Sequence, residues 1–181
     1  SKIQLFENNS EIGAGTRGAS LGIDALKIAA YNSNSNFFKK FDSKIIPTKN
    51  NTLNQEDKFP KAKRIDSIIE VCSSVSFHVS GALKKHQFPF LLSSDHSNAI
   101  GTIAGIKAAN PSLRLGVIWI DAHADLHSPY TTPTGNVHGM SLMASLNQDN
   151  SERRVHELDH LTNRTKQSDL LFCKIYFHLS L

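Results

Sequence analysis

The segment from residue 88 to residue 120 places a helical pattern between two short apolar runs. Residues 88–92 are too few for a helix and are typical of a buried strand. Apolar side chains then recur at helical spacing over residues 97–109, and Asn110-Pro111 predicts the end of that helix. Residues 115–120 are apolar on both alternating faces, as in a central strand of a parallel sheet. This order predicts a βαβ unit, and therefore an α/β fold with helices on both faces of a parallel sheet.

The N-terminal half of the chain adds elements of the same kind. Residues 2–6 alternate polar and apolar and predict a strand, whereas residues 22–30 have the composition and spacing of a helix. The glycine-rich residues 13–20 match neither the dinucleotide nor the P-loop phosphate spacing, so they predict a tight turn that needs glycine. Residues 61–86 repeat apolar side chains at steps of three and four, which predicts a helix with one buried face. Cys72 belongs to that repeat and is expected in the core.

Composition excludes several classes of protein. The 181 residues suffice for one domain with a core, and 39% are hydrophobic and 20% charged. No run approaches the roughly 18 apolar residues of a membrane-spanning helix, and the first residues lack the apolar run of a secretion signal. The two cysteines cannot form a multi-disulfide framework, and the basic residues behind the net charge of +4 are scattered. We therefore expect a cytoplasmic protein that binds neither membrane nor nucleic acid.

The residues suited to chemistry directly follow the second apolar run, in the sequence Asp121-Ala122-His123-Ala124-Asp125. In an extended chain the side chains at i, i+2 and i+4 point the same way, so Asp121, His123 and Asp125 would share one side. They would lie at the carboxyl end of a parallel strand, where open α/β sheets bind ligands. Two carboxylates held so close repel each other unless a cation lies between them, so the pattern predicts a metal site.

A second pair, Asp95-His96, follows the first apolar run. If the two strands are neighbours, His96 can face Asp121 and Asp125, and carboxylates with one or two imidazoles suit a divalent ion such as Mn²⁺. A further histidine lies in residues 134–139, on a loop over the same edge. His96 alone is also compatible with a structural histidine, and His127 with either a substrate loop or solvent. The remaining histidines belong to no constellation of acidic residues and are expected to be surface or structural residues: His78, His86, His156, His160 and His178.

Together these segments resemble the arginases of the ureohydrolase family, and bacterial arginases in particular. The resemblance runs over about residues 2–150 and is carried by residues 11–19, 94–97, 116–125 and 127–139. The Asp-His and Asp-Ala-His-Ala-Asp motifs mark the superfamily. The Gly-Asn-Val-His-Gly motif points to arginase rather than to agmatinase or formimidoylglutamase. The fold that the resemblance implies is a three-layer α/β/α parallel sheet.

The resemblance also implies a site with two manganese ions. His96, Asp121 and Asp125 would hold one ion, and Asp121 would bridge to a second ion that His123 also holds. Water activated by the two ions would hydrolyse the guanidinium group of L-arginine to urea and ornithine, with Asp125 among the groups at the reacting centre. A loop histidine that is proposed to shuttle protons in the family is matched by His138. Three positions match residues that recognise the α-carboxylate end of the substrate, namely His127, Thr134 and Asn136.

Family members are longer than this chain and supply further ligands from a later strand with an Asp-x-Asp pattern, which this sequence lacks. We therefore expect residues 1–150 to form the N-terminal part of the domain, with the sheet incomplete at its C-terminal end, and residues 151–181 to be a divergent or truncated tail. The hydrolysis would then be impaired. Two alternatives stay open: another ureohydrolase, such as an agmatinase, and a non-catalytic arginase fragment. The resemblance also leaves a homo-oligomer open.

Overall fold

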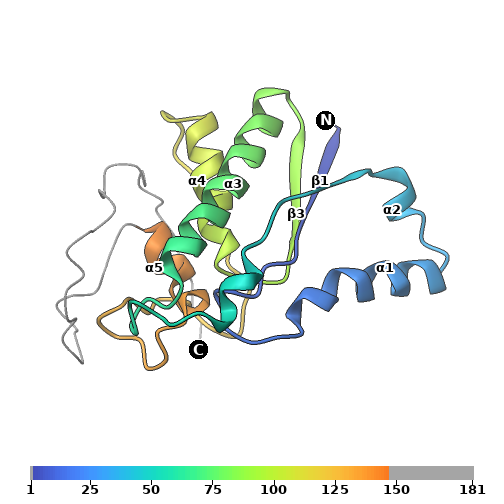
Figure 1. The fold of residues 1–181 in the computed structure, drawn as a ribbon. Coiled ribbons are helices and arrows are strands. Elements are labelled where there is room, and N and C mark those ends of the chain that lie inside the picture. The colour runs from blue at the N-terminus through green and yellow to red at the C-terminus, as the bar shows by residue number, and fades with distance from the viewer. Residues whose placement is uncertain (1, 147–181) are drawn as a thin grey trace, which may run out of the picture.

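The computed structural model describes residues 2–146, and a three-stranded parallel sheet lies at its centre (Figure 1). The strands are β1 (Ile3–Asn8), β2 (Ser43–Ile45) and β3 (Phe88–Ser93), in the order β2-β1-β3. β1 and β3 align with Leu5 beside Phe90. The strands predicted at residues 2–6 and 88–92 are confirmed. β2 was not predicted, because its sequence Ser-Lys-Ile has no apolar pattern. All three of its residues are exposed.

Two long helices cover one face of the sheet. They are α3 (Ile65–Lys84) and α4 (Asn98–Ala109), which confirm the helices predicted at residues 61–86 and 97–109. Phe6 of β1 is buried against Val75 and Val79 of α3, and Ile106 of α4 packs against the same cluster. Burial of this apolar face stabilises the fold by about 1.5–3 kcal/mol for each large side chain.

The contact between α3 and α4 depends on residues without side chains. A Cβ atom at Gly101 would overlap the carbonyl oxygen of Cys72, and one at Gly105 would lie 2.7 Å from the carbonyl oxygen of Ser76. The two glycines, four residues apart, therefore form a smooth stripe on α4 that lets the helices approach closely. Burial in this contact raises the pKa of the Cys72 thiol to about 12, in agreement with its predicted place in the core.

The opposite face of the sheet is contacted by α1 (Gly22–Asn32) and α2 (Phe37–Lys40). Successive side chains of a strand point to opposite faces, so Glu7 lies on the side opposite to Phe6. There Glu7 Oε2 is 2.6 Å from the Nζ atom of Lys27 on α1, and the ring centroid of Phe37 on α2 is 6.0 Å from that of Phe90. Figure 1 shows α3 and α4 on one side of β1 and β3 and α1 and α2 on the other. The predicted α/β architecture is confirmed.

The strand predicted at residues 115–120 is not formed. Leu115 alone makes an isolated bridge, and Ile118 and Ile120 are 89% and 92% exposed. A hollow of about 700 Å³ is lined by this segment together with β3 and α4. A strand is held by ladder hydrogen bonds to its neighbours, and within residues 2–146 no further strand flanks this segment. The apolar pattern is therefore present without the pairing that would make it a strand.

A second apolar cluster lies beneath the N-terminal half of α3. It holds Ile12, Ile68, Val71 and Cys72 together with Val137 and Met140 of a 3-10 turn (Val137–Met140) that leads into α5 (Ser141–Ser145). Two further 3-10 turns are formed by Ala19–Leu21 and Asn50–Asn54. The cluster brings the loop before α5 against the glycine-rich turn after β1, and this contact positions the candidate site.

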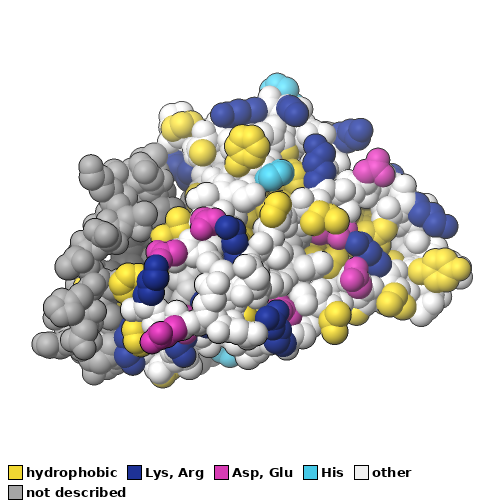
Figure 2. Space-filling view, in the orientation of Figure 1, with side chains coloured by type: hydrophobic (Ala, Val, Ile, Leu, Met, Phe, Trp, Pro, Cys, Tyr) yellow, Lys and Arg dark blue, Asp and Glu magenta, His cyan; other side chains and the backbone are white. Residues whose placement is uncertain are grey.

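The face drawn in Figure 2 shows Lys and Arg side chains interspersed with Asp and Glu, and hydrophobic side chains among them. No helix within residues 2–146 is both long enough and apolar enough to cross a bilayer. The predicted tail at residues 151–181 lies outside the described residues, so its boundary with the domain stays a prediction.

Candidate metal centre

The loop that follows β3 is fixed by a buried carboxylate. Asp95 is 2% exposed, and its side chain accepts hydrogen bonds from the backbone N–H groups of Gly13 and, at 3.0 Å, of Ser97. The Ser93 hydroxyl donates to the Asp95 carbonyl oxygen at 2.8 Å and accepts from the Asp95 backbone N–H. These contacts set the direction of the next residue, His96, at the carboxyl end of β3.

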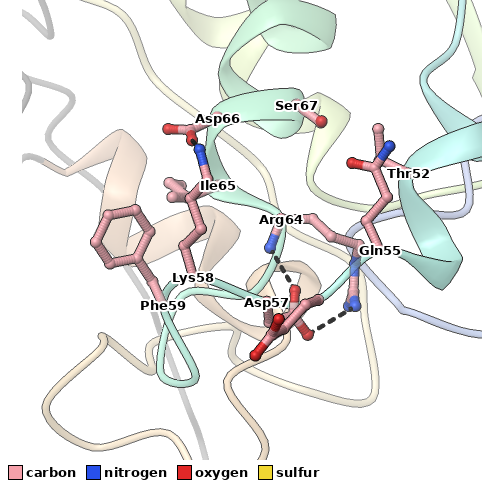
Figure 3. A pocket seen from close by; sticks show the side chains of 10 residues that line it. Thr52, Gln55, Asp57, Lys58, Phe59, Arg64, Ile65, Asp66 and Ser67 are labelled. Atoms are coloured by element: carbon pink, nitrogen blue, oxygen red, sulfur yellow. Dashed lines mark hydrogen bonds and ion pairs between the residues drawn. The ribbon is translucent and has the colours of Figure 1, made fainter.

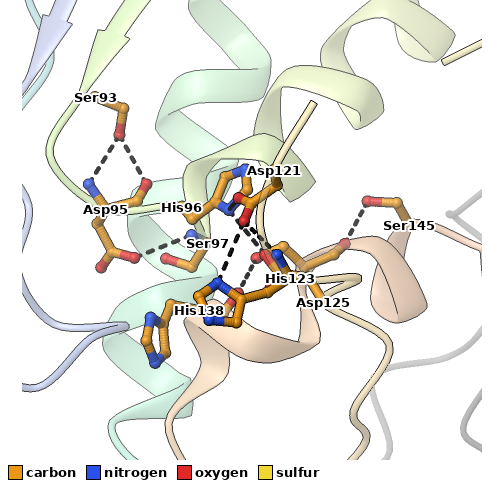
Figure 4. Close-up of polar contacts among 10 residues, drawn as sticks. Ser93, Asp95, His96, Ser97, Asp121, His123, Asp125, His138 and Ser145 are labelled. Carbon is orange, nitrogen blue, oxygen red and sulfur yellow. Dashed lines mark hydrogen bonds and ion pairs between the residues drawn. The ribbon is translucent and has the colours of Figure 1, made fainter. Parts of the chain in front are cut away.

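His96 meets two carboxylates from residues 121–125 (Figure 4). Its Nδ1 atom lies 3.1 Å from Asp121 Oδ2 and 2.8 Å from Asp125 Oδ2. One ligand atom from each of the three residues lies within 4.8 Å of the others. The predicted convergence of His96, Asp121 and Asp125 is therefore present, and three groups with lone pairs surround one point.

The two carboxyl groups differ in their electrostatic environment. The backbone N–H of His123 donates to Asp121 Oδ1 at 2.7 Å and lowers the pKa of Asp121. Burial raises the pKa of Asp125, an effect that the positive charge of His96 partly offsets.

Asp125 also has an oxygen atom that suits a metal. Its Oδ2 atom is buried and has no hydrogen-bond partner among the described residues, because the contact with His96 lacks the alignment of a hydrogen bond. A buried oxygen without a donor costs free energy unless something else satisfies it. The arrangement of Asp125, Asp121 and His96 therefore fits a divalent cation.

The route by which these side chains converge differs from the predicted alternation. Residues 121–123 form a bend, and Asp125 has a left-handed backbone with φ of 49°. The carbonyl oxygen of Asp125 accepts the backbone N–H groups of Leu142 and Met143, each at 3.1 Å, which fixes the turn against α5. His123 does not join the cluster: its side chain is 83% exposed, and its Nδ1 atom lies 3.3 Å from Asp121 Oδ1. The shared face predicted for residues 121, 123 and 125 is wrong because the segment is not extended.

Two of the loop residues with predicted roles are held by hydrogen bonds, His138 to the turn after β1 and Asn136 to Arg64. The backbone N–H of His138 donates to the Gly13 carbonyl oxygen at 3.3 Å, and His138 lies near enough to Asp125 to offset slightly the burial that raises the pKa of Asp125. Asn136 accepts a hydrogen bond at 3.1 Å from Nη2 of Arg64 through its side-chain oxygen. Its own backbone N–H donates to the Thr134 hydroxyl at 3.2 Å.

His127 lies apart from the carboxylate cluster. Its Nδ1 atom is 3.3 Å from the Thr131 hydroxyl, and its backbone N–H donates to the Gly139 carbonyl oxygen. Its side chain lines an apolar pocket of about 230 Å³ with Cys72 and Met140. Of the histidines and aspartates predicted to contact substrate or metal, the structure thus brings His96, Asp121 and Asp125 together, places His138 near them, and leaves His123 and His127 outside the cluster.

Three residues of the site have no predicted role. The ring of Trp119 stacks on His96 with 4.6 Å between centroids and 23° between planes. Asp95 anchors the His96 loop, and Arg64 binds Asn136. A carboxylate directly after an apolar strand is a signal that could have identified Asp95. The contact of Arg64 spans 72 residues of sequence and leaves no local signal.

The fold and the donor groups define an α/β protein with a candidate divalent-metal site at the end of a parallel strand. The chain belongs to the arginase family, whose sequence model matches residues 3–164. It is 33% identical over 145 residues to an arginase of Staphylococcus aureus strain COL, a match that covers 77% of this chain and 47% of that protein.

Solved structures give the same assignment. The arginase of Bacillus caldovelox superposes with a TM-score of 0.70 at 30% identity, covering 82% of this chain and 50% of that one. The arginase of Entamoeba histolytica in complex with L-ornithine superposes with a TM-score of 0.69 at 25% identity over the same shares. The chain therefore spans about half the length of the relatives it matches, and its described fold is of the arginase type.

Proposed function

We propose that this chain carries an arginase-type centre that binds Mn²⁺ and serves the hydrolysis of L-arginine to ornithine and urea. The observation that carries the proposal is the convergence of His96, Asp121 and Asp125 on one point, with a buried Asp125 oxygen that lacks a donor in the described part of the chain. Carboxylates with an imidazole suit Mn²⁺ better than thiolate-preferring metals. The family match supports the same reaction.

Two ions would be held unequally by this chain. His96, Asp121 and Asp125 would hold one ion, whereas residues 2–146 offer the second ion only Asp121 and the exposed His123. The ions, when bound, would lower the pKa of water and so supply a nucleophile near neutral pH. We therefore expect one Mn²⁺ per chain to bind more tightly than a second, and turnover to depend on the weaker site.

The remaining residues would bind substrate and move protons. His138, the loop histidine whose backbone N–H donates to the Gly13 carbonyl oxygen, would exchange a proton with the reacting groups. The α-carboxylate end of L-arginine would be held by donors on the loop before α5, namely His127, Thr134 and Asn136. His127 would have to approach the substrate from outside the carboxylate cluster.

Manganese titration and urea release test this proposal on the purified full chain. Paramagnetic resonance of free Mn²⁺ should reveal at least one bound ion, which Asp121→Ala removes and Asp24→Ala retains, since Asp24 is a 66% exposed residue of α1. Urea should form from L-arginine faster than from agmatine. Absence of Mn²⁺ binding would reject the metal centre. Faster urea release from agmatine would instead indicate another ureohydrolase. Mn²⁺ binding without any urea release would indicate a non-catalytic fragment.

A further inference from the structure

The glycine-rich turn after β1 is held from inside by a buried carboxylate. Glu11 is 2% exposed and accepts the backbone N–H groups of Gly18 at 2.6 Å and Ser20 at 3.0 Å, while its carbonyl oxygen accepts the N–H of Gly15 at 2.9 Å. Gly15 has a left-handed backbone with φ of 73°, which favours glycine. The N–H groups of Gly18 and Ser20 are therefore occupied by the Glu11 carboxylate, and the opposite surface of the turn is left to contact other parts of the chain.

Arg64 lies against that opposite surface. Its side chain is 8% exposed, with Nε donating to the Ile12 carbonyl oxygen at 2.7 Å and Nη1 lying 3.3 Å from Asp57 Oδ2. The backbone N–H of Arg64 also donates to Asp57 at 3.0 Å. Figure 3 shows both contacts between Arg64 and Asp57 beside a pocket of about 160 Å³. The Ile12 carbonyl oxygen and the Asp57 carboxylate therefore fix the orientation of the guanidinium group, and Asp57 balances its positive charge. The Nη2 atom remains for a third partner.

That third partner is the side chain of Asn136, whose Oδ1 atom accepts from Nη2 at 3.1 Å. Gly15 makes room for the pair, because a Cβ atom there would lie 2.5 Å from Arg64 Nη2 and 3.1 Å from Asn136 Oδ1. The backbone is tied at the same place, since the N–H of Lys63 donates to the Gly135 carbonyl oxygen at 2.9 Å. The turn, Arg64 and the loop before α5 thus form one assembly.

The contact decides which end of the Asn136 amide is presented outward. An arginine has only donors, so the atom that faces it must be the amide oxygen, and the two N–H donors of Nδ2 point away from Arg64. A carboxylate ligand needs donors. An Asn136 side chain that could rotate freely would present its oxygen to that carboxylate in half of its orientations.

We propose that Arg64, seated against Gly15, is a positioning residue that orients Asn136 to recognise the carboxylate of the substrate. This inference rests on the proposed function, since it takes L-arginine as the ligand. Arg64 acts through Asn136 and does not contact the metal ligands. Its effect is therefore confined to ligands that carry the α-carboxylate.

Agmatine provides the test, because it is L-arginine without the carboxylate. Calorimetry on the Mn²⁺-loaded full chain should show that Arg64→Met raises the Kd of L-arginine about tenfold, the effect of one lost charge-assisted hydrogen bond. The Kd values of agmatine and Mn²⁺ should change less than twofold. Arg17→Met is the matched control, because Arg17 also pairs with a carboxylate, 3.6 Å from Glu11, but is 57% exposed.

A double-mutant cycle separates orientation from a general structural effect. In the Asn136→Ala background, Arg64→Met should cause no further loss of L-arginine affinity. Asn136→Asp keeps an acceptor for Arg64 and removes the Nδ2 donors, so it should raise the Kd of L-arginine and leave that of agmatine unchanged. This variant replaces Arg64→Met in the test if Arg64→Met does not fold. An equal rise in the Kd of both ligands, or additive losses of L-arginine affinity in the cycle, would overturn the positioning role of Arg64 and leave the proposed function intact. A wild-type chain that binds Mn²⁺ but neither ligand would overturn the proposed substrate, and the positioning role with it.

Discussion

Asp95 and Asp125 are both buried carboxylates, but their surroundings give them different roles. Asp95 accepts two backbone N–H groups, from Gly13 and Ser97, and so fixes the loop that carries His96. Asp125 Oδ2 has no hydrogen-bond partner in the described part of the chain and lies 2.8 Å from His96 Nδ1. A satisfied carboxylate holds structure, whereas an unsatisfied one is available to a cation.

Removal of the Asp95 carboxylate should weaken both the fold and metal binding. Asp95→Ala leaves two backbone N–H groups without acceptors, and we expect the free energy of unfolding to fall by about 2–4 kcal/mol. The affinity for Mn²⁺ should fall about tenfold because His96 loses its orientation. Asp95→Asn, which keeps an acceptor oxygen, should lose less of both. Urea unfolding and Mn²⁺ titration measure the two effects, and wild-type Mn²⁺ affinity in Asp95→Ala would contradict the role of this anchor.

Glu11 should make stability depend on pH on the acidic side. The backbone N–H of Ser20, with that of Gly18 and the charge of Arg17, lowers the pKa of Glu11 in the folded chain. A lowered folded pKa gives stability that is present above the unfolded value of about 4.3 and is lost as the pH falls through the folded value. Glu11→Gln should therefore destabilise the chain more at pH 7 than at pH 3. Urea unfolding across this range measures the slope, with the 57% exposed Glu70 replaced by Gln as control; equal loss at both pH values would contradict the assignment.

Sequence alone predicts which residues form the cluster but not how they meet. Asp121, Asp125 and His96 converge as the motifs imply, because both motifs follow apolar segments that end near each other. The predicted route through an extended strand is wrong, since a bend and the left-handed Asp125 replace it. The pairing of Arg64 with Asn136 depends on tertiary packing across 72 residues, which no local pattern encodes.

At the scale of elements, the packing of α3 on α4 gives a paired prediction about glycine. Gly101→Ala should destabilise the chain by about 1–3 kcal/mol, because its Cβ would overlap the backbone of Cys72. Gly81→Ala, in the interior of α3 with open space around the added atom, should instead stabilise by about 0.5–1 kcal/mol. Urea unfolding of the two variants is the measurement. A destabilised Gly81→Ala together with a neutral Gly101→Ala would contradict the described contact.

Helices were more predictable than strands in this chain for a physical reason. The spacing of Ile68, Val75 and Val79 is a property of the segment itself, and α3 buries that face wherever an apolar surface is available. A strand also needs a partner along its length, which β3 finds in β1, whereas in residues 115–120 the pairing is confined to a single bridge at Leu115. β2 is the reverse case: it pairs with β1, although its residues are exposed and its sequence has no apolar pattern.

At the scale of the whole molecule, the segment at residues 115–120 leaves apolar side chains in water. Joint replacement of Ile118 and Ile120, which are 89% and 92% exposed, by serine should change the free energy of unfolding by less than about 1 kcal/mol. It should also reduce self-association, because exposed apolar patches promote contact between molecules. Light scattering and urea unfolding test this. Val79→Ser is the buried control and should lower the free energy of unfolding by about 2–4 kcal/mol. An equally large loss in the double isoleucine variant would contradict the exposure of the segment.

The carbonyl oxygen of Asp125 accepts hydrogen bonds from two N–H groups in the first turn of α5, so the residue proposed to bind a cation through its side chain is bonded to a helix through its main chain. Any event that unwinds α5, whether heating, a nearby substitution or a protease cut, would release that carbonyl group. The Asp125 carboxylate would then be free to move away from His96 and Asp121. Loading with manganese should in turn slow amide hydrogen exchange at Leu142 and Met143, which makes this short helix a reporter of occupancy some distance along the chain from the ion.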